Sequence, residues 1–167
     1  MDRCAGCGFE YRLDEAENAH IEITEAAAVL AEILRDDSAD LRSRRDPQLW
    51  SPLEYGCHVR DVLLVQRERV LRARREDCPS FAPMGRDERV EHDGYATQDP
   101  HDVARQLTDA AALFTNVLDR LGPDDWERDV AYNYPRHMTR SLRWVAVHTV
   151  HELRHHLQDV RAQLASA

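Results

Sequence analysis

The sequence contains no lysine, so all 22 of its lysine-or-arginine positions are arginine. Chemistry that depends on a lysine amine, such as a Schiff base or a phosphate-binding P-loop, is therefore excluded. Arginines are outnumbered by 31 acidic residues, which gives a formal net charge of -9. Because nucleic-acid binding normally requires a basic face to meet the phosphates, this charge balance argues against a nucleic-acid partner.

Long apolar runs are also missing. None approaches the ~20 residues needed to cross a bilayer, and the first residues lack the basic start and apolar stretch of a secretion signal. We therefore expect no membrane partner and a cytoplasmic location. The chain has 167 residues, of which 43% are hydrophobic and 32% charged. It fits one domain, 1–167, large enough to bury a core without disulfide or metal staples.

Four amphipathic segments dominate the chain, and no strand pattern matches them in strength. Apolar residues recur at helical spacing and predict helices over 13–35, 51–76, 99–121 and 139–165. The fold class expected is all-α. The links before the second and third helices are longer than the tight turns of a simple up-and-down bundle. They favour a four-helix bundle with long crossover connections.

Local signals mark the helix starts and one long loop. Ser51, Pro52 and Glu54 make a capping box with proline at the first helical position, and Asp99 with Pro100 repeats the N-cap and proline pair. The segment 78–98 has no helical period. Loops of this length often lie over a functional site.

Four histidines lie close together in the middle of the last predicted helix. His151 and His155 are four residues apart, so they stack on one helix face and can place two imidazoles on one ion. His148 falls on the same stripe, where packing or an outer-shell role is expected. His156 is expected to point about a quarter-turn or more away from that stripe.

The third ligand expected is His58, which lies on an otherwise largely apolar face of the second helix. A buried histidine needs a partner, and the alternative to a metal is an ordinary hydrogen bond in the core. His58, His151 and His155 are predicted to hold one divalent metal ion, zinc or nickel, with an open position. Asp61 and Glu152 are the catalytic candidates. Glu152 follows His151 as the base does in metalloprotease helices, and Asp61 is one turn beyond His58.

The cysteines leave three interpretations open. Cys4 and Cys7 form a single CxxC pair in an N-terminal extension, 1–12. The pair is compatible with a second metal site completed by distant residues, with a disulfide formed on oxidation, or with free thiols. Cys57 is expected to be a small buried residue, since free cysteine packs readily in cores.

Two phrases of the chain resemble the DinB-like superfamily of bacterial metalloproteins: WSPLEYGCHVRDVL (50–63) and WVAVHTVHELRHHLQDV (144–160). The N-terminal CAGCGFEY (4–11) is similar to actinobacterial members. The resemblance implies a four-helix bundle of the DinB/YfiT-like type with one divalent metal held by three histidines. These map onto His58, His151 and His155.

The resemblance also implies candidate activities. Relatives include thiol S-transferases that use mycothiol, bacillithiol or glutathione, so the first expectation is a metal-dependent S-transferase acting on a small-molecule thiol such as mycothiol and an electrophile. A metal-dependent hydrolase with Glu152 as base is the first alternative. The second is a non-catalytic metal-binding protein of the stress response. The sequence leaves a homodimer open.

Overall fold

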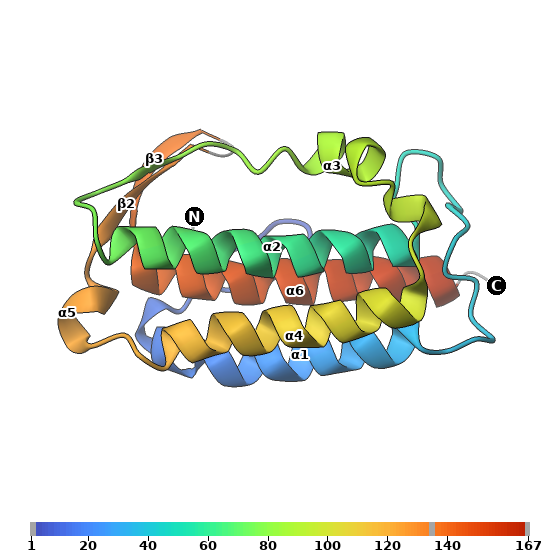
Figure 1. The fold of residues 1–167 in the computed structure, drawn as a ribbon, viewed down its shortest axis with the longest axis horizontal. Coiled ribbons are helices and arrows are strands. Elements are labelled where there is room, and N and C mark those ends of the chain that lie inside the picture. Colours follow the sequence, from blue (N-terminus) through green and yellow to red (C-terminus); the bar gives the residue numbers. More distant parts are fainter. Residues whose placement is uncertain (1–2, 134–135, 166–167) are drawn as a thin grey trace.

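Four long helices run side by side along the molecule (Figure 1). The computed structural model describes residues 3–133 and 136–165, so the first two residues of the expected extension 1–12 lie outside the described residues. The four helices are α1 (Ala19–Leu34), α2 (Pro52–Ala73), α4 (Pro100–Leu118) and α6 (Leu142–Ala165). They confirm the four helices predicted from the sequence to within a few residues at most ends.

The helix directions require a crossover connection. In Figure 1, α2 and α4 point the same way, opposite to α1 and α6. The chain leaves one end of α2 and travels back along the bundle before it enters α4. This connection contains β1 (Ser80–Phe81), the short helix α3 (Arg86–His92) and the 3-10 helix η2 (Tyr95–Thr97). The expected crossover is therefore present, and it covers one side of α2.

The core lies between the helices, with α2 packed against both α4 and α6 and α1 packed against the same two helices. Ten of its largest fully buried side chains are apolar or aromatic: Tyr95, Phe114, Ile23, Leu30, Leu34, Leu53, Leu63, Leu107, Leu142 and Leu153. Two others, His58 and Gln66, are polar. Both polar side chains lie on α2, the helix that faces α6.

A small sheet corrects the expectation of a strictly all-α fold. β2 (Asp129–Asn133) pairs antiparallel with β3 (His137–Ser141), and β1 pairs parallel with β2. Thr139, expected to begin the last helix, lies in β3, and α6 begins at Leu142. β1 was missed because it has two residues and a partner, β2, that is distant in the sequence. β2 and β3 are neighbours in the sequence, but each has five residues and neither alternates between buried and exposed positions in full. Short strands without apolar alternation carry no local signal.

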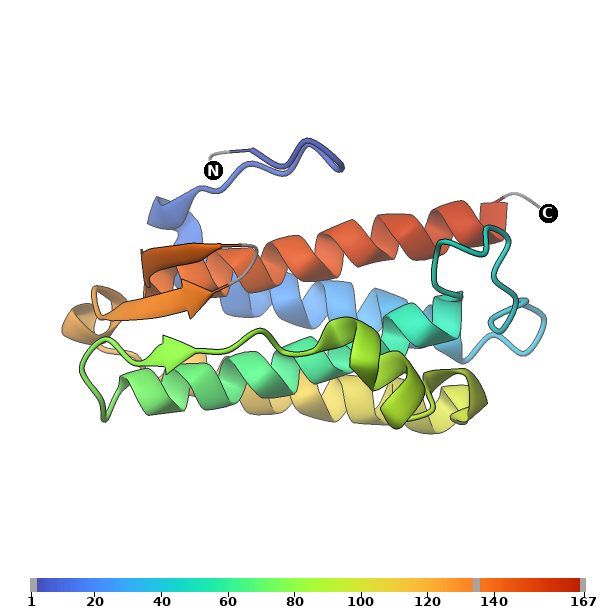
Figure 2. The same cartoon turned by 90° about the horizontal axis from the view of Figure 1, so that it is seen from above.

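The first predicted helix and the connection to the sheet also differ in detail. The 3-10 helix η1 (Leu13–Asn18) precedes α1, and the short helix α5 (Pro123–Trp126) follows α4. Before η1, the N-terminal segment lies along the outside of α6 (Figure 2). None of the described helices combines the length and the hydropathy that a membrane span requires.

The start of α2 shows why this helix begins where the sequence predicts. The Ser51 hydroxyl accepts a hydrogen bond from the Glu54 amide at 3.3 Å, and the Glu54 carboxylate accepts one from the Ser51 amide at 2.7 Å. Arg44 donates to the same carboxylate at 2.8 Å. The two bonds between Ser51 and Glu54 satisfy backbone amides that the first turn of a helix leaves without a partner, and Arg44 holds the Glu54 carboxylate in place.

Ser51→Ala should therefore lower the free energy of unfolding by about 1–2 kcal/mol, because the cap hydroxyl is fully buried and its loss leaves the Glu54 amide unsatisfied. Urea unfolding followed by circular dichroism measures this change. The matched control is Ser38→Ala in an exposed loop, for which we expect a change within about 0.5 kcal/mol. Equal unfolding midpoints for the two variants would contradict the capping role.

Candidate metal centre

His58 lies within α2 and is only 2% exposed. Its Nδ1 atom is buried and has no hydrogen-bond partner among the described residues. A buried polar atom without a partner is costly to a fold. The Trp50 ring lies against the imidazole, with centroids 5.0 Å apart, so His58 is held in place by packing. A metal ion is one partner that such a histidine can take.

Two side chains of α6 face His58. The Nε2 atom of His58 lies 4.0 Å from Oε2 of Glu152, and Nε2 of His156 lies 3.6 Å from the same oxygen. One potential ligand atom from each of His58, Glu152 and His156 lies within 4.8 Å of the others. Two imidazoles and one carboxylate form a donor set known from catalytic zinc sites, where a fourth position stays open. We call these three residues the cavity group.

The sequence-predicted ligands do not come together as one group. Among the described residues, His151 and His155 are grouped with Cys4 and Cys7, whereas His58 is grouped with Glu152 and His156. Two smaller groups overlap these: His148 with His151 and Glu152, and His155 with His156 and Asp159. Glu152 and His156 each follow the predicted ligand by one position, which is about 100° around a helix. The stripe turned toward α2 is therefore the one containing His156, which was expected to point away.

The protonation states of two members of the cavity group suit a metal. Burial, together with nearby His156, lowers the pKa of His58 to about 3, so this imidazole is neutral at pH 7. Burial opposes ionisation of Glu152, but the close approach of the His151 and His156 imidazoles outweighs it and holds the pKa of the carboxyl well below its usual range. A neutral imidazole and an ionised carboxylate are the forms that bind a metal.

His156 is oriented by a further carboxylate. Its Nδ1 atom lies 2.9 Å from Oδ2 of Asp159, which leaves Nε2 on the side of Glu152. Burial alone would lower the pKa of His156, but the hydrogen bond with Asp159 and the nearby Glu152 carboxylate raise it to about 8, so this imidazole must release a proton to bind a metal at pH 7. Carboxylate–histidine pairs of this kind fix the ring orientation of metal ligands and make the ligand more basic.

A cavity of about 320 Å³ opens beside the cavity group. His58, Glu152 and His156 line it together with His148, His151 and His155 of α6 and Tyr132 of β2. Arg69 of α2 lines the wall, and residues 83–88 of the crossover connection lie over it, including Arg86, Asp87 and Glu88. The expectation that the long loop 78–98 covers a functional site is consistent with this arrangement.

Asp61 occupies a different environment from the one expected for a catalytic residue. Its carboxylate accepts hydrogen bonds from Arg60 at 2.8 Å, Tyr95 at 2.7 Å and Arg89 at 3.0 Å. It does not line the cavity beside His58. These contacts join α2 to η2 and α3, so they hold the crossover connection against the bundle.

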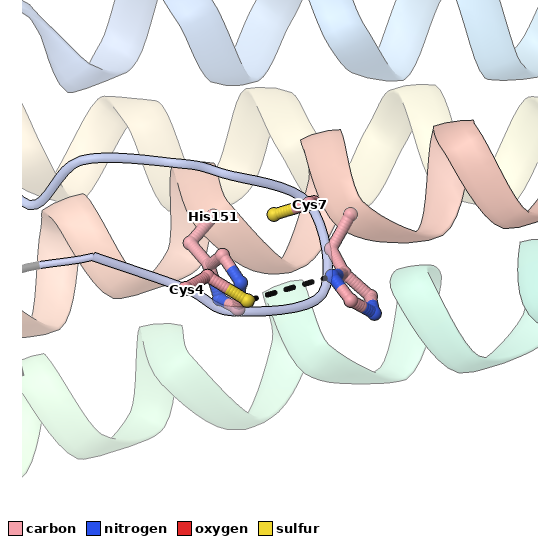
Figure 3. A group of neighbouring side chains, drawn as sticks. Cys4, Cys7 and His151 are labelled. Atoms are coloured by element: carbon pink, nitrogen blue, oxygen red, sulfur yellow. Dashed lines mark hydrogen bonds between the residues drawn. The ribbon is translucent and has the colours of Figure 1, made fainter.

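The second group of ligand-type side chains lies where the N-terminal segment crosses α6. One potential ligand atom from each of Cys4, Cys7, His151 and His155 lies within 4.8 Å of the others. Figure 3 shows the two sulfur atoms beside the His151 ring. Both thiols are free, and Cys57 is also free and fully buried, as expected.

The sequence analysis did not consider His156 as a ligand, and it gave Glu152 the role of a base. Both carry a signal that was available, because Glu152 and His156 have the same four-residue spacing as His151 and His155. The spacing alone could not decide which pair faces α2. The CxxC pair was the second signal. A metal site with two cysteine ligands needs two more ligands, and His151 and His155, which are not in the cavity group, lie beside the two cysteines.

The fold and the site together define a class: a four-helix-bundle protein with metal-ligating side chains gathered beside a cavity. The chain belongs to the DinB superfamily, whose family model matches residues 22–160. The cavity group falls inside the matched range, whereas Cys4 and Cys7 precede it.

One solved structure with the same fold is YfiT from Bacillus subtilis, described as "a probable metal-dependent hydrolase with an unusual four-helix bundle topology". The two chains superpose with a TM-score of 0.77 over 92% of this chain and 86% of that one, at 17% sequence identity. At this identity the likeness shows the fold alone. A search of curated proteins finds no significant match.

Proposed function

We propose that the protein is a metal-dependent thiol S-transferase that uses a small-molecule thiol such as mycothiol, and that His58, Glu152 and His156 hold its one catalytic metal, zinc or nickel. The observation that carries the assignment is the approach of these three ligand-type side chains beside a cavity of about 320 Å³. The burial of His58, whose Nε2 faces Glu152, and the pairing of His156 with Asp159 support it. This ligand set replaces the His58, His151 and His155 set expected from the sequence.

A bound divalent metal would supply Lewis acidity, which lowers the pKa of a thiol at its open position. In the proposed reaction the thiolate sulfur forms a bond to an electrophilic carbon while the bond to the leaving group breaks. The leaving group keeps the electron pair, and the thiol proton goes to solvent.

The chain's own residues position the reactants. Residues 83–88 cover the cavity and limit access of water. Arg69 and Arg86 place cationic groups in a lining that also contains carboxylates. Arg69 is fixed by its hydrogen bond to the Tyr132 hydroxyl at 2.7 Å. A cavity with fixed cationic groups suits a polar co-substrate that must be held near the cavity group.

The contacts of Glu152 with four histidines favour thiol transfer over hydrolysis. Its two carboxylate oxygens lie 3.3 to 4.0 Å from ring nitrogens of His151, His156, His148 and His58. A hydrolase needs a base that is free to take a proton from water. In our assignment Glu152 is a ligand and not that base, whereas a thiol bound to a metal needs no dedicated base at neutral pH.

A metal-dependent hydrolase is the second candidate. The description of YfiT favours it, and so do Asp87 and Glu88, which line the cavity from the crossover connection and supply carboxylates outside the ligand group. Either enzyme would act in the cytoplasm, where thiols are kept reduced.

Thiol consumption separates the candidates. Protein loaded with zinc or nickel is incubated with mycothiol, or with glutathione or bacillithiol, and a chromogenic aryl halide, and in parallel with a simple aryl ester without thiol. We expect thiol-dependent turnover of the halide. His58→Ala should lower the turnover rate by at least about 100-fold, because a Lewis acid lowers a reaction barrier by several kcal/mol.

The matched control is His101→Ala, a histidine whose side chain is 54% exposed and lies outside the cavity. Its turnover should equal that of the wild type. If the wild type hydrolyses the ester without thiol and His58→Ala does not, the protein is a hydrolase and the transferase proposal is wrong. Tight metal binding without turnover of either substrate would favour the non-catalytic metal-binding protein.

A further inference from the structure

The N-terminal segment folds back on itself around its CxxC pair. The Cys4 amide donates to the Phe9 carbonyl at 2.8 Å, and the Gly8 amide donates to the Cys4 carbonyl at 2.9 Å. Gly8 has a φ of 75°, a left-handed conformation that favours glycine and lets the chain reverse directly after Cys7. This tight turn brings both thiols to the same side of the segment.

The turn lies directly on α6. A Cβ atom added to Gly6 would lie 3.0 Å from Cε1 of His155, so the backbone between the two cysteines approaches that ring closely. The Cys4 sulfur lies 3.9 Å from Nδ1 of His155. Ligand atoms around a tetrahedral zinc ion, with bonds of about 2.0 to 2.3 Å, are separated by about 3.3 to 3.8 Å. The observed separation is close to that range.

His151 supplies an independent observation. It is 9% exposed, and neither of its ring nitrogens has a hydrogen-bond partner among the described residues. Nδ1 lies 3.3 Å from a carboxylate oxygen of Glu152, without the alignment of a hydrogen bond. The Phe9 ring packs on the imidazole with centroids 5.4 Å apart. A buried imidazole next to two thiols, with both nitrogens unsatisfied, is the expected state of an apo metal ligand.

We propose that Cys4, Cys7, His151 and His155 form a second metal site, a closed tetrahedral zinc site that fastens the N-terminal segment to α6. Two thiolates and two imidazoles are the donor set of structural zinc, and four protein ligands leave no position for a substrate. Thiolate donors select zinc over the oxygen-preferring ions magnesium and calcium. The site is separate from the cavity group and does not depend on the catalytic proposal.

The site would also shape one wall of the cavity. The Tyr11 hydroxyl lies 3.0 Å from Nδ1 of His148, and the Tyr11 ring packs on His151 with centroids 5.4 Å apart. Both histidines line the cavity. A zinc ion that fixes residues 4–7 on α6 would therefore hold Tyr11 behind these side chains.

The test is spectroscopic and uses the full chain. Apo protein is reconstituted with cobalt(II), whose near-ultraviolet charge-transfer absorption requires thiolate ligands. We expect the absorption in wild type and in His58→Ala, and its loss in Cys4→Ser and Cys7→Ser. Zinc affinity at this site, measured by chelator competition, should fall by at least about 100-fold in Cys4→Ser, because even outer-shell changes cost 10–100-fold. Cys78→Ser, which alters an exposed cysteine, is the matched control.

A second measurement works on the wild type and so does not depend on a variant that folds. A mercurial reagent that titrates thiols should release zinc in step with the modification of two cysteines. Absence of thiolate-to-cobalt absorption in the wild type would overturn the proposal. A disulfide between Cys4 and Cys7 in protein purified without oxidant would also overturn it. The same holds if thiol modification releases no zinc and only the His58→Ala substitution does.

Discussion

His156→Ala should weaken metal binding at the cavity group by more than about 100-fold, whereas His155→Ala should leave it within a few-fold of the wild type. His156 presents Nε2 to the Glu152 carboxylate at 3.6 Å, and Asp159 holds the opposite side of its ring. Loss of an outer-shell partner alone costs 10–100-fold in metal affinity, so loss of a ligand should cost more. His155 is not grouped with His58; it lies near the cysteines and near His156 and Asp159.

The measurement is zinc or nickel titration by calorimetry in a background in which Cys4 and Cys7 are both serine. In that background the cysteines cannot hold metal, so the titration reports the cavity group alone. His58→Ala is the positive control and should match His156→Ala. If His155→Ala and His151→Ala weaken binding while His156→Ala does not, the ligand set expected from the sequence is the right one.

Asp61→Ala should lower the free energy of unfolding by about 3 kcal/mol, because it leaves the buried Arg60 guanidinium without its nearest carboxylate. Arg60 is 7% exposed and Asp61 5% exposed. The buried Tyr95 hydroxyl loses its acceptor as well. Arg60 keeps Asp93 at 3.2 Å, which limits the loss to the lower end of the range for a broken buried pair.

Urea unfolding of the metal-free protein measures this change. Asp109→Ala is the matched control: the Asp109 side chain is 66% exposed and 3.7 Å from Arg105, and its removal should cost less than about 0.5 kcal/mol. Metal affinity should be nearly unchanged in both variants. An Asp61→Ala protein of wild-type stability that loses turnover would restore the catalytic role expected from the sequence.

The helices were predictable because their signals are local. The capping box at Ser51 and the Asp99–Pro100 pair specify helix starts within a few residues of chain, and both were confirmed. The three-stranded sheet was not predictable in this way. The pairing of Ser80 with Ala131 joins segments far apart in sequence, and only the folded bundle brings them together.

The site was predictable in composition but not in register. The sequence correctly singled out His58 as a buried, inward-facing histidine of α2. On α6, two overlapping pairs have identical spacing: His151 with His155, and Glu152 with His156. The choice between them depends on the rotation of α6 relative to α2. Packing along the whole helix sets this rotation, so residues 151–156 alone do not reveal it.

Glu152 contacts both histidine groups, and this has a thermodynamic consequence. Its carboxylate lies 3.3 Å from Nδ1 of His151 and 3.6 Å from Nε2 of His156. A cation held by either group would draw on the same negative charge and alter the free energy of binding at the other. Linkage makes this effect reciprocal, so each ion must change the affinity for the other by the same factor. The two sites would therefore share one coupled binding equilibrium. A change in the concentration of one metal in the cell would change the metal occupancy of both sites.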